Sequence, residues 1–72
     1  MITIFTDGAA KGNPGRGGFG VLIARGDTVT ELGGHRARTT NNEMELTAVV
    51  EALKAVVSAG EPVAIYTDSK YV

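Results

Sequence analysis

The 72-residue sequence has seven lysines and arginines against eight aspartates and glutamates, 43% apolar residues and no cysteine. This length allows one small domain of marginal stability, and the lack of cysteine excludes disulfide and thiolate sites. No apolar stretch approaches the roughly 18 residues of a membrane-spanning helix, and no signal peptide is recognised, so we expect a reducing, cytoplasmic location.

The near-neutral net charge does not by itself indicate a nucleic-acid-binding protein. Most basic residues nevertheless lie in the first 38 positions: Lys11, Arg16, Arg25, Arg36 and Arg38, accompanied there by the acids Asp7, Asp27 and Glu31. On charge alone we interpret this part of the chain as an ordinary solvated surface. The single histidine, His35, is expected to be a solvated side chain without a function.

The first half of the chain predicts an antiparallel meander. Residues 1–7 are rich in β-branched and aromatic types and predict a buried strand that stops at Asp7. Residues 8–18 predict a glycine-rich loop, whose spacing fits neither dinucleotide-binding nor P-loop motifs. Residues 19–25 and 28–32 predict two further strands, joined by a tight turn at Gly26 and Asp27.

The second half predicts a crossover helix and a parallel strand. After a polar loop over residues 33–42, Thr40 and Glu43 form a capping-box pattern, and the helix runs to about Ser58, before Gly60. Residues 63–68 repeat the apolar pattern that ends in aspartate, and residues 69–72 resemble the first turn of another helix. Because parallel strands need a crossover connection, the first and last strands can lie side by side.

Three acidic side chains are then expected to meet. Asp7 and Asp68 would lie about 5 Å apart, where two negative charges repel by roughly 3 kcal/mol at an effective dielectric constant of about 20. Glu45 falls on the apolar side of the helix, where a carboxylate is costly unless it is paired. Three oxygen ligands around an open pocket suit Mg²⁺, and such a site performs metal-assisted phosphoryl chemistry.

These motifs resemble the type 1 ribonuclease H family. The matching stretches are residues 5–18, 39–46 and 66–72, which contain Phe-Thr-Asp-Gly with a glycine-rich segment, Thr-Thr-Asn-Asn-x-Met-Glu-Leu, and Tyr-Thr-Asp-Ser. They occur in the order and at the spacing of the family. The resemblance implies an endonuclease that hydrolyses the RNA strand of RNA–DNA hybrids with two Mg²⁺ ions, although Mn²⁺ is an alternative. Asp7 would bridge both ions, while Glu45 and Asp68 would complete the ligands of one.

The resemblance also implies substrate contacts, because the 2′-hydroxyl distinguishes RNA from DNA in a wide minor groove. Backbone at Gly8 and Ala9 would approach these hydroxyls, the asparagines would enter the groove, and an arginine and a threonine would hold a phosphate of the DNA strand. The implied substrate-binding residues are Gly8, Ala9, Asn13, Arg38, Thr40, Asn41, Asn42 and Lys70. Without the motif, helix capping is the preferred interpretation of Asn41 and Asn42.

The family has a fourth catalytic carboxylate, which has no counterpart in residues 1–72. The expected fold is therefore an α/β, ribonuclease H-like mixed sheet that stops after the fourth strand, with an unpaired outer edge at residues 63–66. We expect residues 1–72 to be the N-terminal portion of a single domain, inactive alone, with the rest supplied by the same or another chain.

Two other functions stay open at this point. A non-catalytic module that binds RNA or RNA–DNA hybrids would keep the fold without the second metal ion. A small Mg²⁺-dependent phosphatase or nucleotide-binding domain would use the paired aspartates for a small phosphate ligand. The Asn41–Asn42 pair and the long meander argue against this last function.

Overall fold

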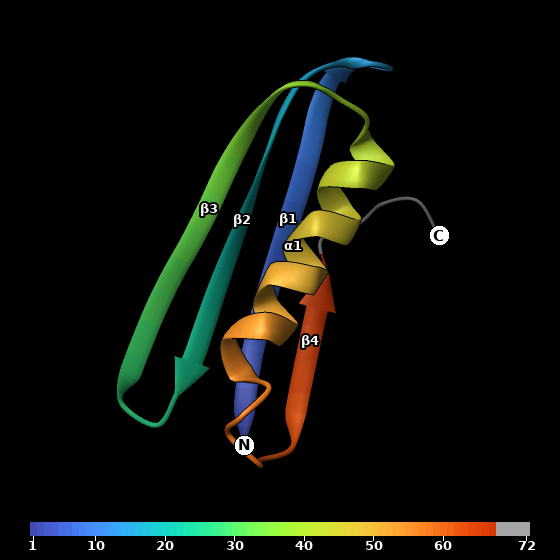
Figure 1. The fold of residues 1–72 in the computed structure, drawn as a ribbon. Coiled ribbons are helices and arrows are strands. Elements are labelled where there is room, and N and C mark those ends of the chain that lie inside the picture. The colour runs from blue at the N-terminus through green and yellow to red at the C-terminus, as the bar shows by residue number, and fades with distance from the viewer. Residues whose placement is uncertain (68–72) are drawn as a thin grey trace.

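The computed structural model describes residues 1–67, which form one four-stranded sheet with a helix on one face (Figure 1). The elements are β1 (Ile2–Gly12), β2 (Gly15–Arg25), β3 (Thr28–Thr39), α1 (Asn41–Val56) and β4 (Val63–Thr67). The strand order is β3-β2-β1-β4, with β1 antiparallel to β2 and parallel to β4. The predicted meander, crossover helix and parallel final strand are therefore confirmed.

The prediction of a glycine-rich loop over residues 8–18 is wrong. The first strand continues to Gly12 and the second begins at Gly15, so only Asn13 and Pro14 form the turn of a long hairpin. Glycine is disfavoured inside strands because it loses more conformational entropy and has no side chain to pack. Here the absence of a side chain is required, because a Cβ at Gly17 would overlap the side chain of Thr39.

The third strand is also longer than the sequence predicts. It extends from Thr28 to Thr39 instead of ending at Leu32, so most of the predicted loop over residues 33–42 is strand. The polar composition of this stretch reflects its place at the edge of the sheet, where most side chains meet solvent. Thr39 is the exception, because it is 1% exposed beneath the start of α1.

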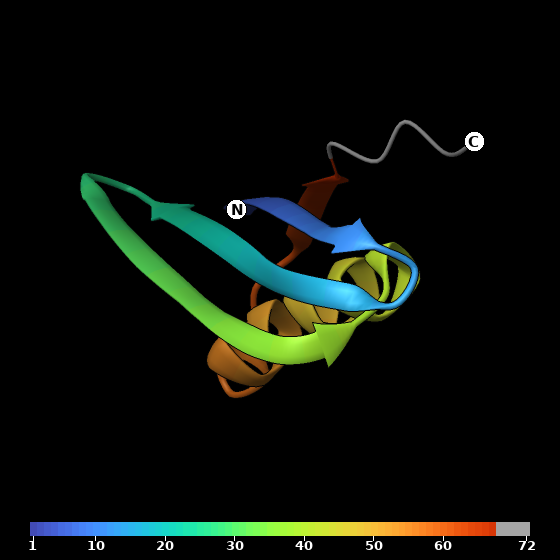
Figure 2. The same cartoon turned by 90° about the horizontal axis from the view of Figure 1, so that it is seen from above.

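The core lies between α1 and one face of the sheet (Figure 2). Isoleucines and valines that alternate along β1 and β2 face the helix, and alanines let the helix approach closely. The buried hydrophobic residues are Ile2, Ile4, Val21, Ile23, Met44, Ala48 and Ala52. The helix ends at Val56, slightly before the predicted end, and Gly60 has the positive φ of 67° that favours glycine after a helix.

Apolar surfaces outside this core are exposed in the described part of the chain. On the sheet face opposite α1, the rings of Phe5 and Tyr66 stack with centroids 5.5 Å apart. On the outer side of α1, four apolar side chains form a stripe that faces solvent: Leu46, Val50, Leu53 and Val57. Within residues 1–67, β4 forms the edge of the sheet opposite to β3, and no helix is long and apolar enough to cross a membrane.

We predict that Ile4→Ala lowers the free energy of unfolding of the full-length protein by about 2–5 kcal/mol, because the isoleucine is fully buried and its truncation leaves a cavity. Val29→Ala is the matched control, since this side chain is 60% exposed on β3 and its loss should cost about 0.5 kcal/mol or less. Urea denaturation measures both. Equal losses for the two variants would contradict this description of the core.

Candidate active site

An open pocket of about 290 Å³ lies where β4 ends beside β1 and α1 begins. The last parallel pair is Thr6 with Thr67, so β1 continues past the end of β4 at Asp7. This position lies within a strand and not at its end, contrary to the prediction. The pocket is lined by Thr6, Asp7, Gly8, Asn42, Glu45, Leu46, Val49 and Thr67.

Two of the three predicted metal ligands line this pocket together. Asp7 is exposed on β1, and Glu45 is half-buried in the second turn of α1, although the two residues are 38 positions apart in the sequence. Asp68 and Lys70, with the predicted helical turn over residues 69–72, lie outside the described residues. Within residues 1–67, no three acidic, histidine or cysteine side chains form a group that could hold a metal ion. The three-carboxylate site therefore stays a prediction.

Gly8 sets the distance between the strand and the helix at this pocket. A Cβ built on Gly8 would meet the carbonyl carbon of Met44, lie 2.5 Å from its oxygen and lie 2.7 Å from the Glu45 nitrogen. No larger residue fits here without moving the helix, because contacts of this kind are far shorter than van der Waals separation. The absence of a side chain at Gly8 therefore allows the backbone of Glu45 to lie directly against the strand that carries Asp7.

The predicted capping box holds the beginning of α1. The Glu43 backbone N–H donates to Thr40 Oγ1 at 3.1 Å, and the Thr40 backbone N–H donates to Glu43 Oε1 at 3.0 Å. The buried hydroxyl of Thr39 donates to the same carboxylate oxygen at 3.2 Å. These bonds satisfy donors at the N-terminus of the helix and fix the turn that precedes Glu45.

Asn41 connects α1 to β1, a role that the sequence did not reveal. Its Oδ1 accepts a hydrogen bond from the Ala10 backbone N–H at 2.5 Å. The N-cap is Thr40, so the capping interpretation of the two asparagines is wrong. Asn42 is exposed and lines the pocket beside Glu45. No local pattern could identify the partner of Asn41, because the bonded residues are 31 positions apart.

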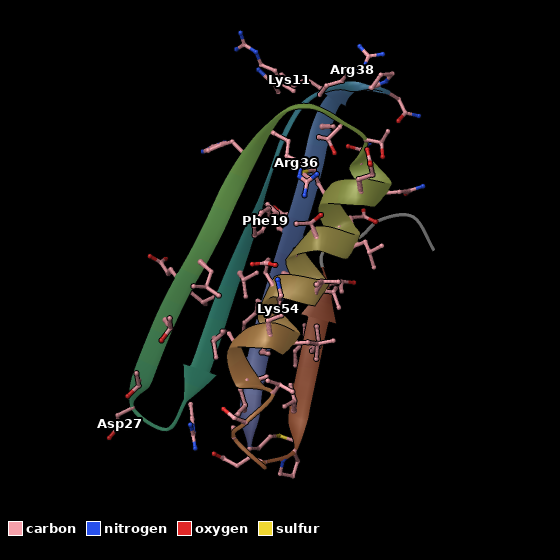
Figure 3. All side chains as sticks on the ribbon, viewed as in Figure 1. Lys11, Phe19, Asp27, Arg36, Arg38 and Lys54 are labelled. Atoms are coloured by element: carbon pink, nitrogen blue, oxygen red, sulfur yellow. The ribbon has the colours of Figure 1, made fainter. Side chains whose placement is uncertain are left out.

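The remaining predicted substrate-binding positions lie around the same end of the sheet. Ala9 is exposed on β1, and Asn13 is exposed in the turn between β1 and β2. Arg38 is exposed near the end of β3, and Figure 3 shows it at the same end of the molecule as Lys11. Thr40, as the half-buried N-cap, has its hydroxyl engaged in the capping box.

The chain matches known proteins along its whole length. The family model described as RNase H matches residues 1–72. The chain is 58% identical to a ribonuclease H of Chlorobium luteolum over 73 aligned residues that cover 99% of it, and 58% identical to a ribonuclease H of Polaromonas over 100% of it. These alignments cover 48% and 45% of the two relatives, so the chain spans about half the length of the curated relatives it matches.

Solved structures share this fold. LC11-RNase H1, in a crystal structure with an RNA/DNA hybrid, superposes with a TM-score of 0.84 at 36% identity, over 97% of this chain and 56% of that one. The N-terminal RNase H domain of a Mycobacterium tuberculosis protein also has a TM-score of 0.84, at 33% identity, over 96% of this chain and 52% of that one.

We predict that Gly8→Ala lowers the free energy of unfolding by about 1–3 kcal/mol, because the new methyl group forces α1 away from β1. Gly20→Ala is the control: it pairs with Asp7 in the neighbouring strand, and a Cβ there meets nothing within 4 Å. Denaturation of the full-length protein measures both changes. An equally stable Gly8→Ala variant would show that the helix does not need this close approach.

Proposed function

The chain belongs to the ribonuclease H family, and we propose that the protein is an endonuclease that hydrolyses the RNA strand of RNA–DNA hybrids. The observation that carries this proposal is the meeting of Asp7 and Glu45 in one open pocket beside the last described residue of β4. The solved neighbour with an RNA/DNA hybrid supports the substrate class. A cytoplasmic location stays a prediction.

We propose that Asp7, Glu45 and Asp68 hold Mg²⁺, with two ions in the complete active site and Mn²⁺ as the alternative ion. The donors fit this ion, because Mg²⁺ prefers carboxylate oxygens and keeps several waters, which an open pocket of about 290 Å³ accommodates. Bound divalent ions supply activation of the attacking water and stabilisation of the leaving oxygen.

The two described carboxylates are available for a cation. Within residues 1–67, the ion pairs join Met1 and Arg25 to Glu61, and Lys54 to Glu51, so none involves Asp7 or Glu45. Glu45 lies half-buried in the second turn of α1 and lines the pocket together with Asp7. Two acids that have no ion-pair partner among residues 1–67 repel each other in one pocket, and a divalent cation removes that repulsion.

The residues around the start of α1 are proposed to position the hybrid. Exposed Asn42 adjoins Glu45 in the pocket, where a short amide side chain can reach the minor groove. The bond from Ala10 to Asn41 holds the backbone of Gly8 and Ala9 against the helix, so these groups approach the substrate together. Arg38 and Lys70 are proposed phosphate contacts, and Asn13 and Thr40 complete the predicted substrate-binding set.

We propose that residues 1–72 are the N-terminal portion of one ribonuclease H domain. The exposed stripe of Leu46, Val50, Leu53 and Val57 supports this, because a surface helix normally turns such residues toward a packed neighbour. The chain spans about half of its relatives, which is consistent with a further part that covers this stripe and brings the fourth carboxylate.

We predict that Glu45→Gln in the full-length protein lowers the rate of hybrid cleavage in Mg²⁺ by more than about a hundredfold, because loss of a residue that merely orients a metal ligand already costs 10–100-fold. Glu51→Gln is the control: the same change on the same helix, at a half-buried glutamate paired with Lys54. Gel assays of a labelled RNA–DNA hybrid measure both rates, and Asp7→Asn should match Glu45→Gln. Near-normal cleavage by Glu45→Gln would refute the proposed ligand set.

We also predict that purified residues 1–72 do not cut the hybrid and bind at most one Mg²⁺, with millimolar affinity, because they carry only three of the four carboxylates. Calorimetry and the same gel assay test this, with the full-length protein as the positive control. Robust cleavage by residues 1–72 would overturn the ligand count. Hybrid binding without cleavage by the full-length protein would favour the non-catalytic binding module instead.

A further inference from the structure

Three basic side chains gather on the sheet face opposite α1, near the tip of the β1–β2 hairpin. Lys11 and Arg16 are directly opposite each other in the register of β1 with β2, and His35 is opposite Gly18 in the register of β2 with β3. Side chains alternate between the faces of a sheet, so all three share one face with Ala9. They line an open pocket of about 410 Å³ whose walls are basic and whose floor is small residues.

The positive charges of this pocket have no acidic partner in the described part of the chain. Like charges directly opposite each other on two strands are destabilising. The ion pairs within residues 1–67 nevertheless leave out both Lys11 and Arg16. Figure 3 shows Lys11 at the end of the molecule where α1 begins, whereas Asp27 lies at the opposite end. Two neighbouring positive charges without an acidic partner among residues 1–67 are typical of a surface that binds an anionic ligand.

The floor of the pocket leaves room for such a ligand. A Cβ on Gly18 would lie 3.3 Å from Nδ1 of His35 and 3.1 Å from the Gly34 carbonyl oxygen, so glycine allows the imidazole to lie close over the hairpin. Ala9, the partner of Gly18 across the strands, projects only a methyl group. A tetrahedral anion can therefore approach the hairpin between the ammonium, guanidinium and imidazole groups.

We propose that Lys11, Arg16 and His35 form a phosphate-binding site for the backbone of the nucleic acid, distinct from the carboxylate pocket. This proposal rests on the proposed function and replaces the earlier interpretation of these residues as an ordinary solvated surface. Lys11 follows Asp7 by four positions along β1, about 13 Å at the rise of a strand. That separation corresponds to about four base-pair steps, so the site holds a phosphate well away from the bond that is cut and extends the contact surface along the duplex.

The test measures binding of a fluorescein-labelled RNA–DNA hybrid to the full-length protein across a range of salt concentrations, in an Asp7→Asn background that prevents cleavage. Each phosphate contact contributes about 0.7–0.9 to the slope of log K against log[salt]. Lys11→Gln and Arg16→Gln should each lower that slope by about this amount and lower affinity by roughly five- to tenfold at 0.1 M salt. Lys54→Gln is the control: an equal charge change on α1, at a side chain that Figure 3 shows away from the hairpin tip.

The outcomes separate this proposal from the proposed function. Lower affinity and a smaller slope for the hairpin variants, with an unchanged Lys54→Gln variant and an undiminished Tm, support the phosphate site. An unchanged slope for Lys11→Gln and Arg16→Gln overturns it, even if affinity falls. Equal losses for all three lysine and arginine variants also overturn it, because they indicate only an effect of net charge. Failure of the full-length protein with Asp7 intact to cleave the hybrid would instead refute the proposed function.

Discussion

The arrangement of the candidate site depends on the close approach of α1 to β1 at Gly8. There the backbone of Met44 and Glu45 occupies the space that a side chain would need. The alternation of the strand points Thr6 and Gly8 toward the helix, while Asp7 between them remains exposed and lines the pocket. Two carboxylates on different elements can share a small pocket only because the elements that carry them are in backbone contact.

Two further interactions fix the same end of the helix. The capping box of Thr40 and Glu43 determines where the first turn begins, and the bond from Ala10 to Asn41 determines where that turn lies on the sheet. The capping box is a local interaction and sets the direction in which the helix starts. The bond from Ala10 to Asn41 is long-range and sets the position of the helix on the sheet. Together they restrict the placement of Glu45 without using its carboxylate, which leaves the carboxylate for other partners.

The surface of residues 1–67 carries an acidic pocket, a basic pocket and exposed apolar side chains. Asp7 and Glu45 line the pocket at the start of α1, whereas Lys11 and Arg16 line a separate pocket near the tip of the β1–β2 hairpin. Under the proposed function, a nucleic acid with bound divalent cations would be complementary to both regions at once. The outer stripe of α1 and the stacked rings of Phe5 and Tyr66 are surfaces of a different kind, because exposed apolar area is normally covered by further packing.

The sequence by itself determined the elements whose signals are local: the capping box at Thr40, the helix with Glu45 on its inner side, and the two apolar strands that the crossover makes parallel. It also indicated that Asp7 and Glu45 would meet, because strand order and helical periodicity restrict where these side chains can lie.

Only the tertiary structure decided that the glycine-rich stretch is strand, that Asn41 bonds to Ala10, and that the basic residues at Lys11 and Arg16 face each other. Each of these outcomes depends on a partner in another element. Local propensity describes the secondary structure that a residue prefers by itself. Pairing between strands and contact with a helix decide whether the residue adopts that structure in the folded protein.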